Sequence, residues 1–146
     1  MKGKLVKVVL DTNIWLSGLF WEGEAAKIIE LAERKKIIPL VSKDILQEIV
    51  EVLNKESKFQ KFLKERKQKI EAVIRKIISI SEIIETSTKL DILEEDPSDN
   101  KFLETALDEN AQYIISYDKH LLDLKEFRNI PILKPNEFLE IKEWAN

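Results

Sequence analysis

Hydrophobic residues in this chain form two kinds of pattern, short continuous runs and longer stretches with helical spacing. The runs at residues 5–10, 37–41 and 113–117 are short and rich in β-branched or aromatic side chains, which is typical of buried strands. Residues 83–84 and 130–133 predict two further strands, and the prolines around the last one favour an edge position for it. The runs together predict a sheet of about five strands.

Stretches with an apolar residue every three or four positions separate these runs and predict helices. The longest, residues 59–78, carries one apolar stripe that Arg66 interrupts, so we expect two helices that form a hairpin arm. Ser42 is the expected N-cap of the helix that follows the second strand. Strands that alternate with helices predict an α/β fold, a three-layer α/β/α sandwich with a central parallel sheet. The other expected helices cover residues 24–35, 43–53, 99–108 and 136–144.

Length and composition limit the kinds of site that this chain can build. The 146 residues suit one domain, residues 1–146, with a sizeable core. The absence of cysteine excludes disulfides, thiolate ligands and cysteine nucleophiles, and the single histidine excludes a zinc site of several histidines. The net charge of -3 argues against a surface that is basic throughout. No secretory signal or membrane span is recognisable, which predicts a cytoplasmic protein without a membrane partner.

Aspartates follow the hydrophobic runs at several points of the chain. Asp11 and Asp118 come directly after two of the predicted strands, and a cluster with Asp96 and Asp99 follows the pair Ile92-Leu93. Ligands of an open parallel sheet bind beyond the carboxyl ends of its strands, so these carboxylates are expected to converge there. The alternative is that Asp11, Asp99 and Asp118 act only as N-caps, since each also begins a predicted helix.

Glu48 differs from the aspartates because it lies inside a predicted helix, where capping is unavailable. Its neighbours Ile45 and Ile49 belong to the apolar stripe, so Glu48 borders the buried face. A carboxylate in that place needs a partner such as a cation or a basic side chain. The alternative is an exposed glutamate at the edge of the stripe.

Four converging carboxylates without a basic residue between them would repel one another, and their pKa values would rise unless a divalent cation neutralised them. Oxygen ligands favour magnesium or manganese. Such an ion activates water and stabilises charge on phosphate oxygens, so hydrolysis of a phosphodiester is the chemistry that fits best. That reaction needs no nucleophilic side chain.

Basic residues gather between positions 55 and 76. Lys58, Lys61 and Lys64 are spaced by three and share one side of a helix, opposite its apolar stripe, where they could contact RNA phosphates. The alternative is an ordinary solvated helix face. Three aromatic residues soon after Asp11 are candidates for base stacking or a partner surface, or else for the core and a dimer interface: Trp15, Phe20 and Trp21.

Four motifs occur in order along nearly the whole chain, and they read VVLDTN from Val8, SKDILQE from Ser42, DPSDNKFLETAL from Asp96 and SYDKHLL from Ser116. In these motifs the chain resembles PIN-domain nucleases, close to the VapC-like toxins of toxin–antitoxin systems. The resemblance implies a ribonuclease that depends on Mg²⁺ or Mn²⁺. It also implies a toxin that a small antitoxin protein holds inactive by filling the acidic groove, and it implies a homodimer. Its implied metal ligands are Asp11, Glu48, Asp99 and Asp118, with Asp96 as an outer ligand and with Asn13 and Ser116 in supporting hydrogen bonds.

One position departs from the family pattern. Many relatives carry a further acid two residues after the last aspartate, where this chain has His120. A missing carboxylate would weaken a second metal site, so a PIN-like scaffold that binds RNA or protein without cutting is a rival hypothesis.

Two other enzyme classes fit less well. A dehalogenase-type phosphatase requires an aspartate at the position of Asn13. A receiver domain that accepts a phosphoryl group would use Lys134, but Glu48 would have no role in it.

Overall fold

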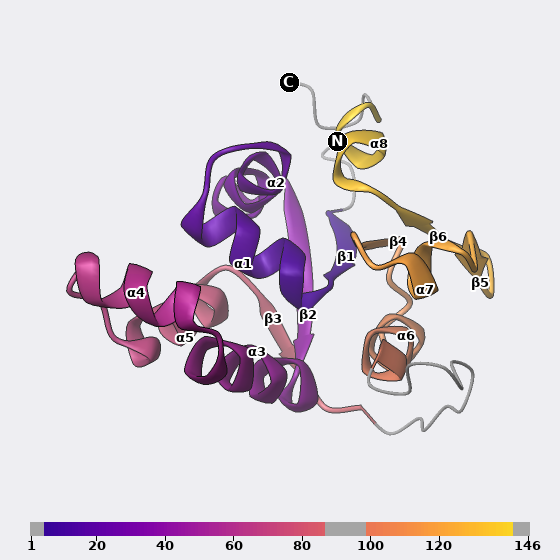
Figure 1. The fold of residues 1–146 in the computed structure, drawn as a ribbon. Helices are drawn as coiled ribbons and strands as arrows, with labels where there is room; N and C mark the ends of the chain where they lie inside the picture. Colours follow the sequence, from indigo (N-terminus) through magenta and orange to yellow (C-terminus); the bar gives the residue numbers. More distant parts are fainter. Residues whose placement is uncertain (1–4, 87–98, 142–146) are drawn as a thin grey trace.

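The protein is built around a six-stranded sheet that is parallel except at one edge (Figure 1). The computed structural model describes residues 5–86 and 99–141. Strands lie in the order β3-β2-β1-β4-β6-β5, and only β5 is antiparallel to its neighbour. The strands are β1 (Val6–Leu10), β2 (Ile37–Ser42), β3 (Glu82–Ile84), β4 (Tyr113–Ile115), β5 (Glu126–Phe127) and β6 (Ile130–Leu133).

Every strand expected from the sequence is present, but the last one is not at the edge. β6 pairs with β4 on one side and with the unexpected β5 on the other, so the sheet has six strands rather than about five. Arg128 and Asn129 join the two strands with positive φ angles of 49° and 70°. Two successive residues with positive φ form the tight turn of a hairpin, and neither of these two is the glycine that usually occurs in such a turn.

Eight helices lie within the described residues, most of them where the spacing of apolar residues predicts them. The connection between the first two strands holds both α1, the helix that Asp11 was expected to begin, and the helix expected at residues 24–35, with Gly23 at a φ of 134° between them. The closing helix is shorter than residues 136–144. The helices are α1 (Thr12–Phe20), α2 (Glu24–Glu33), α3 (Lys43–Lys55), α4 (Ser57–Glu65), α5 (Ile70–Ser79), α6 (Asn100–Asp108), α7 (Lys119–Leu122) and α8 (Pro135–Leu139).

The long stripe at residues 59–78 forms two helices, as expected. α4 ends at Glu65, and Lys67 takes a positive φ of 52° before α5 begins at Ile70. Both helices pack against α3, and together they form the arm at the left of Figure 1. Each helix contributes two buried apolar residues to the core, which are Phe59 and Leu63 from α4, and Val73 and Ile77 from α5.

Helices cover both faces of the sheet, with α1, α2 and the arm on one side and α6 and α7 on the other (Figure 1). Strands β1 and β2 are almost completely buried, as strands covered on both faces must be. None of the described helices is long and apolar enough to cross a membrane.

The order of the strands reverses between β1 and β4, which lie side by side in the middle of the sheet. The chain moves from β1 outward to β2 and β3, and then returns to the other side of β1 to form β4. In open α/β sheets the crevice at such a switch point is the usual place for a ligand. The carboxyl ends of β1 and β4 lead directly into Asp11 and Ser116.

Candidate active site

Asp11 lies at the switch point, buried with 4% of its surface exposed. Its Oδ1 accepts a hydrogen bond from the backbone N–H of Ile14 at 2.9 Å and so caps α1. Its Oδ2 accepts the hydroxyl of Ser116 and the backbone N–H of Tyr117, the latter at 3.2 Å. The residue therefore performs the capping role and, with its other oxygen, also joins β1 to the end of β4.

Ser116 connects Asp11 to Asp118. Its hydroxyl donates to Asp11 and accepts the backbone N–H of Asp118 at 2.8 Å. Asp118 is half-buried, and its Oδ1 accepts the backbone N–H of His120 at 2.7 Å, which caps the short helix α7. One serine side chain thus joins the carboxylate of Asp11 to the backbone of Asp118.

The electrostatics at this point disfavour a charged Asp11. The pKa of Asp11 is raised from 3.8 to about 6, mainly by burial and also by the charge of Asp118, although the hydrogen bonds from Ser116, Ile14 and Tyr117 lower it. The pKa of Tyr117 is raised as well, by partial burial first and then by the charges of Glu24 and Asp11. A bound cation would stabilise the charged form of Asp11, which its burial disfavours.

Glu48 reaches the same region from α3. Its Oε2 accepts the hydroxyl of Thr12, the residue that follows Asp11. Its Oε1 lies 2.7 Å from the Nζ of Lys101 on α6, and the side chains of Glu48 and Lys101 are only 22% and 17% exposed. Of the two partners that the sequence leaves open for Glu48, a cation or a basic side chain, the structure contains the basic side chain.

The remaining predicted residues lie at different places around this group. Asp99 is buried, 7% exposed, directly before α6 and two residues from Lys101. Asn13 is exposed in the first turn of α1. Asp96 lies outside the described residues. The structure thus links Asp11 through Ser116 to the backbone of Asp118, and links Glu48 to Thr12, the neighbour of Asp11. Asp99 directly precedes α6, the helix whose Lys101 contacts Glu48.

These residues fit a hard divalent cation in their chemistry, since every candidate ligand is a carboxylate and Asp11 is in surroundings that favour neutralisation of its charge. As the side chains stand, no three acidic or histidine residues within 5–86 and 99–141 gather closely enough to hold a metal ion. Glu48 already has a cationic partner in Lys101. The residue types therefore suit a hard cation, while the described side chains are not gathered around one point, and Lys101 is the partner of one of them.

Comparison with known families decides what kind of domain this is. The family model described as PIN domain matches residues 7–120. The chain belongs to the PIN domain family. Members of this family are generally nucleases, and the matched residues include Asp11, Glu48, Asp99 and Asp118.

Two solved structures share the fold of this PIN domain. One is VapBC2 from Rickettsia felis bound to a DNA fragment from its promoter, with a TM-score of 0.57, 19% sequence identity, and coverage of 87% of this chain and 97% of that chain. The other is PAE2754 from Pyrobaculum aerophilum, with a TM-score of 0.59, 15% identity, and coverage of 97% and 91%. At such identities the likeness concerns the fold alone. No curated protein matches the chain significantly.

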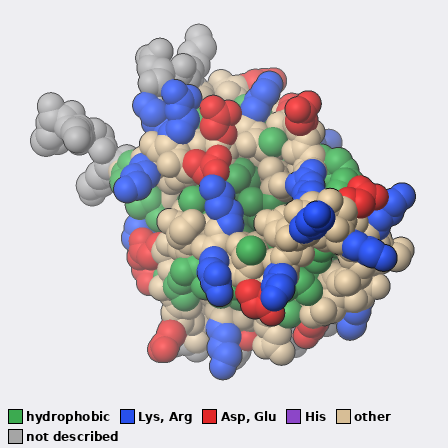
Figure 2. Space-filling view, turned by 90° about the vertical axis from the view of Figure 1, so that its left-hand side faces the viewer, with side chains coloured by type: hydrophobic (Ala, Val, Ile, Leu, Met, Phe, Trp, Pro, Cys, Tyr) green, Lys and Arg blue, Asp and Glu red, His purple; other side chains and the backbone are tan. Residues whose placement is uncertain are grey.

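The predicted RNA-contacting lysines of this PIN domain lie on the arm. Lys61 and Lys64 are exposed on α4, and Lys58 lies 5.7 Å from the ring centre of Trp21 and 3.7 Å from Glu56. Figure 2 shows this face, where basic side chains are spread between hydrophobic and acidic ones. In Figure 1 α4 lies well apart from α6 and α7.

The three aromatic residues after Asp11 have different surroundings. Trp15 and Phe20 are core residues, with 0% and 3% of their surface exposed. Trp21 is 37% exposed and packs edge-on against Phe62, with ring centres 5.0 Å apart. Of the three, only Trp21 presents surface to a partner or a base.

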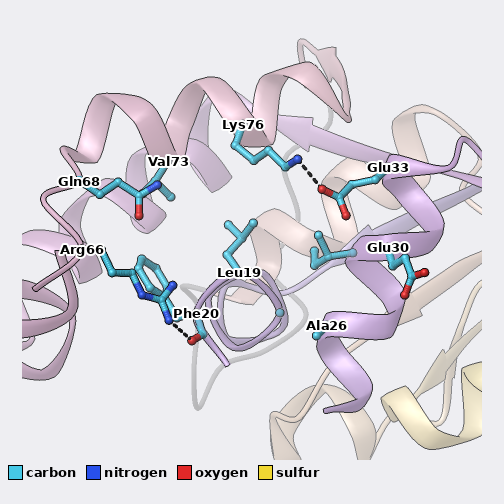
Figure 3. A pocket seen from close by; sticks show the side chains of 11 residues that line it. Leu19, Phe20, Ala26, Glu30, Glu33, Arg66, Gln68, Val73 and Lys76 are labelled. Atoms are coloured by element: carbon cyan, nitrogen blue, oxygen red, sulfur yellow. Dashed lines mark hydrogen bonds and ion pairs between the residues drawn. The ribbon is translucent and has the colours of Figure 1, made fainter. Parts of the chain in front are cut away.

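A groove of about 530 Å³ opens at the far end of α1 from Asp11. Figure 3 shows that α1, α2 and the arm line it. Arg66 donates from its Nη2 to the backbone oxygen of Phe20 at 2.9 Å, and Lys76 forms an ion pair with Glu33. Among the described residues, no predicted metal ligand lines this groove, so it is separate from the candidate active site.

Two residues outside the predicted ligand set bind Glu48, namely Thr12, a hydrogen-bonding residue expected at the start of α1, and Lys101, which the sequence analysis did not single out. Both belong to the motifs that surround the aspartates, and Lys101 gave a weak signal of its own. It lies in the first turn of a predicted helix, where the helix dipole disfavours a cation. A lysine in that place suggests an acidic partner, but the pairing with Glu48 depends on how α3 and α6 pack.

Proposed function

We propose that this PIN domain is a divalent-metal-dependent endoribonuclease that hydrolyses phosphodiester bonds of RNA. The observation that carries the proposal is the buried Asp11, joined through Ser116 to Asp118 at the switch point of the sheet. The raised pKa of Asp11 means that its charged form is disfavoured there, and a bound cation would stabilise that form. Membership in a family that consists generally of nucleases supports the same chemistry.

In this proposal Asp11, Glu48, Asp99 and Asp118 hold Mg²⁺ or Mn²⁺, with Asp96 as an outer ligand. A cation bound by these carboxylates lowers the pKa of a water molecule and stabilises charge on the phosphate oxygens. Ser116 fixes the Oδ2 of Asp11 by its hydrogen bond and so orients the carboxylate. Asn13 supports the first turn of α1 beside it.

Cleavage of RNA by point variants tests the proposal. We expect the purified protein to cut single-stranded RNA in Mn²⁺ or Mg²⁺, and to lose at least about a hundredfold in rate in Asp118→Asn, because a ligand of the ion is removed. Asp123→Asn, an exposed aspartate five residues later, is the matched control and should keep full activity. Cleavage that persists unchanged in EDTA, or in a folded Asp118→Asn protein, would refute the mechanism.

We further propose that the nuclease is a cytoplasmic toxin restrained by an antitoxin protein. The fold that it shares with VapBC2 supports this proposal. Induced expression of the wild type is expected to arrest bacterial growth, whereas Asp118→Asn is expected to be harmless. Growth that continues at equal levels of soluble wild-type protein would contradict the toxin hypothesis.

The assembly is a separate part of the proposal. We expect residues 1–146 to form one domain and to associate as a homodimer. Light scattering after size-exclusion chromatography measures the mass of the assembly against the 17.1 kDa of one chain. A mass equal to one chain across the accessible concentrations would contradict the dimer.

A second candidate function is a PIN-like scaffold that binds RNA or protein without cutting it. The ion pair between Glu48 and Lys101 favours this candidate, because it neutralises one of the four expected ligands. A scaffold would bind RNA equally well in EDTA and in Mn²⁺ and would leave it intact. The dehalogenase and receiver alternatives have no support, since the chain belongs to another family.

A further inference from the structure

Lys101 forms an ion pair with Glu48, one of the predicted metal ligands. Its Nζ lies 2.7 Å from the Oε1 of Glu48, with most of both side chains buried. Resting on the proposed metal-dependent function, we propose that Lys101 is a built-in counter-ion, which holds Glu48 in the metal-free protein and leaves this carboxylate when a divalent cation binds. Lys101 is then a positioning residue that sets the affinity of the site for metal.

The position of Lys101 is unfavourable for a cation unless an acid compensates it. The residue is the second of α6, where the exposed backbone N–H groups and the helix dipole repel positive charge. With only 17% of the side chain exposed, the ammonium has also lost much of its hydration. The carboxylate of Glu48 offsets both effects, and it can do so only because α3 packs beside α6.

Both oxygens of Glu48 are engaged in the structure. The hydroxyl of Thr12 donates to Oε2, and the ammonium of Lys101 donates to Oε1. Lys101 on α6 and Thr12 on α1 thus engage one oxygen of Glu48 each. A divalent cation that binds Glu48 comes close to the ammonium of Lys101, and the two positive charges repel each other unless Lys101 withdraws.

Asp11 and Asp118 present a contrast. Within residues 5–86 and 99–141 neither of them forms an ion pair with a lysine or an arginine. The hydrogen bonds that Asp11 and Asp118 accept come from neutral donors, whereas Glu48 has a positively charged partner. Lys101 and the metal compete for the same carboxylate, and by linkage each weakens the binding of the other.

Titration calorimetry with Mn²⁺ tests this competition. We expect Lys101→Met, which keeps a side chain of similar length without the charge, to bind Mn²⁺ about five- to tenfold more tightly than the wild type. Lys101→Arg keeps the charge and is expected to bind like the wild type. In EDTA the melting temperature of Lys101→Met should fall, and saturating Mn²⁺ should restore it. A purely structural lysine would instead weaken metal binding in Lys101→Met.

A double-mutant comparison shows whether the effect passes through Glu48. In a Glu48→Gln background, Lys101→Met is expected to change the Mn²⁺ affinity by at most about twofold, because the carboxylate that the two cations share is gone. An equal gain in both backgrounds would overturn the inference, as would unchanged or weaker binding by Lys101→Met alone. Lys101→Gln replaces the methionine variant if the latter does not fold.

The failure of this inference differs from the failure of the proposed function. If the wild type binds Mn²⁺ and Lys101→Met binds it no better, only the role of Lys101 is wrong. If neither protein binds Mn²⁺, the metal site itself is refuted, and the counter-ion role with it.

Discussion

Asp11 shows how one residue fits two interpretations that the sequence presents as alternatives. An aspartate between a strand and a helix predicts an N-cap, and one at the end of a buried strand predicts convergence with others. The structure contains both, since one oxygen caps α1 and the other meets Ser116 and Tyr117, more than a hundred positions away. Local patterns predict the cap. Only the pairing of β1 with β4 brings about the second contact.

Glu48 marks where prediction from the sequence stops at the residue scale. Its need for a partner follows from its place beside Ile45 and Ile49. The identity of the partner does not, because Lys101 is separated from Glu48 by 53 positions and by the packing of two helices. The roles of Glu48, Asp99 and Asn13 toward a metal stay predictions.

The raised pKa of Asp11 makes a prediction about stability and pH. The pKa is about 6 in the folded chain against an ordinary 3.8, so between these values the folded state holds a proton that the unfolded state has lost. The stability that the protonated carboxyl gives the folded state is fully present below about pH 4. It is lost as the pH rises through 6, which lowers the free energy of unfolding by about 3 kcal/mol. Asp11→Asn does not titrate, so its melting temperature in EDTA should rise relative to wild type from pH 4 to pH 8.

Thermal denaturation across that range makes the measurement, with Asp123→Asn as the exposed control that should follow the wild type. If the melting temperatures of wild type and Asp11→Asn change in parallel with pH, the charge of Asp11 does not destabilise the folded protein. The argument for a cation at the switch point would then lose its electrostatic basis.

At the scale of elements, the sequence is informative wherever a segment is long enough to show a period. The break of the arm near Arg66 and the cap at Ser42 are both confirmed. β5 was missed because two residues show no alternation, and its turn through Arg128 and Asn129 has no glycine. The prolines near β6 suggested an edge strand, but the edge belongs to β5.

The contact between α1 and α2 depends on Gly18. A Cβ at this position would lie 2.7 Å from the backbone oxygen of Ala25 and would also overlap the side chain of Ile29. Gly18→Ala is therefore expected to destabilise the fold by about 1–3 kcal/mol, despite the better helix propensity of alanine. Urea unfolding measures the change, with Lys27→Ala on the exposed side of α2 as the control. Unchanged stability would mean that the two helices separate at little cost.

The exposed lysines of α4 give a prediction about RNA. The charge reversals Lys61→Glu and Lys64→Glu should weaken the binding of a single-stranded RNA oligonucleotide. They should also make the slope of the logarithm of the binding constant against the logarithm of the salt concentration shallower, by about 0.7 for each phosphate that the protein no longer neutralises. Binding is measured by fluorescence anisotropy in EDTA at several salt concentrations. Lys27→Glu is the matched control on α2. If all variants show the slope of the wild type, α4 is an ordinary solvated face.

At the scale of the whole molecule, alternation of strands and helices predicts the parallel sheet but not its order. The order arises from pairings across the chain, since β1 lies between β2 and β4, and the last of these begins more than a hundred residues later. That order places the carboxyl ends of β1 and β4 together and so brings Asp11 into contact with Ser116 and Tyr117. The motifs contain these residues, but only the topology brings them together, and the convergence of all four predicted ligands stays a prediction.

The most direct test is a crystal structure of the protein with Mn²⁺, measured with anomalous diffraction. We expect one strong anomalous peak between the carboxylates of Asp11 and Asp118, about 2.0–2.3 Å from an oxygen of each, with the ammonium of Lys101 withdrawn from Glu48. A peak elsewhere, or no peak at a concentration of Mn²⁺ that supports RNA cleavage, would contradict the claim that these carboxylates form the metal site of a nuclease.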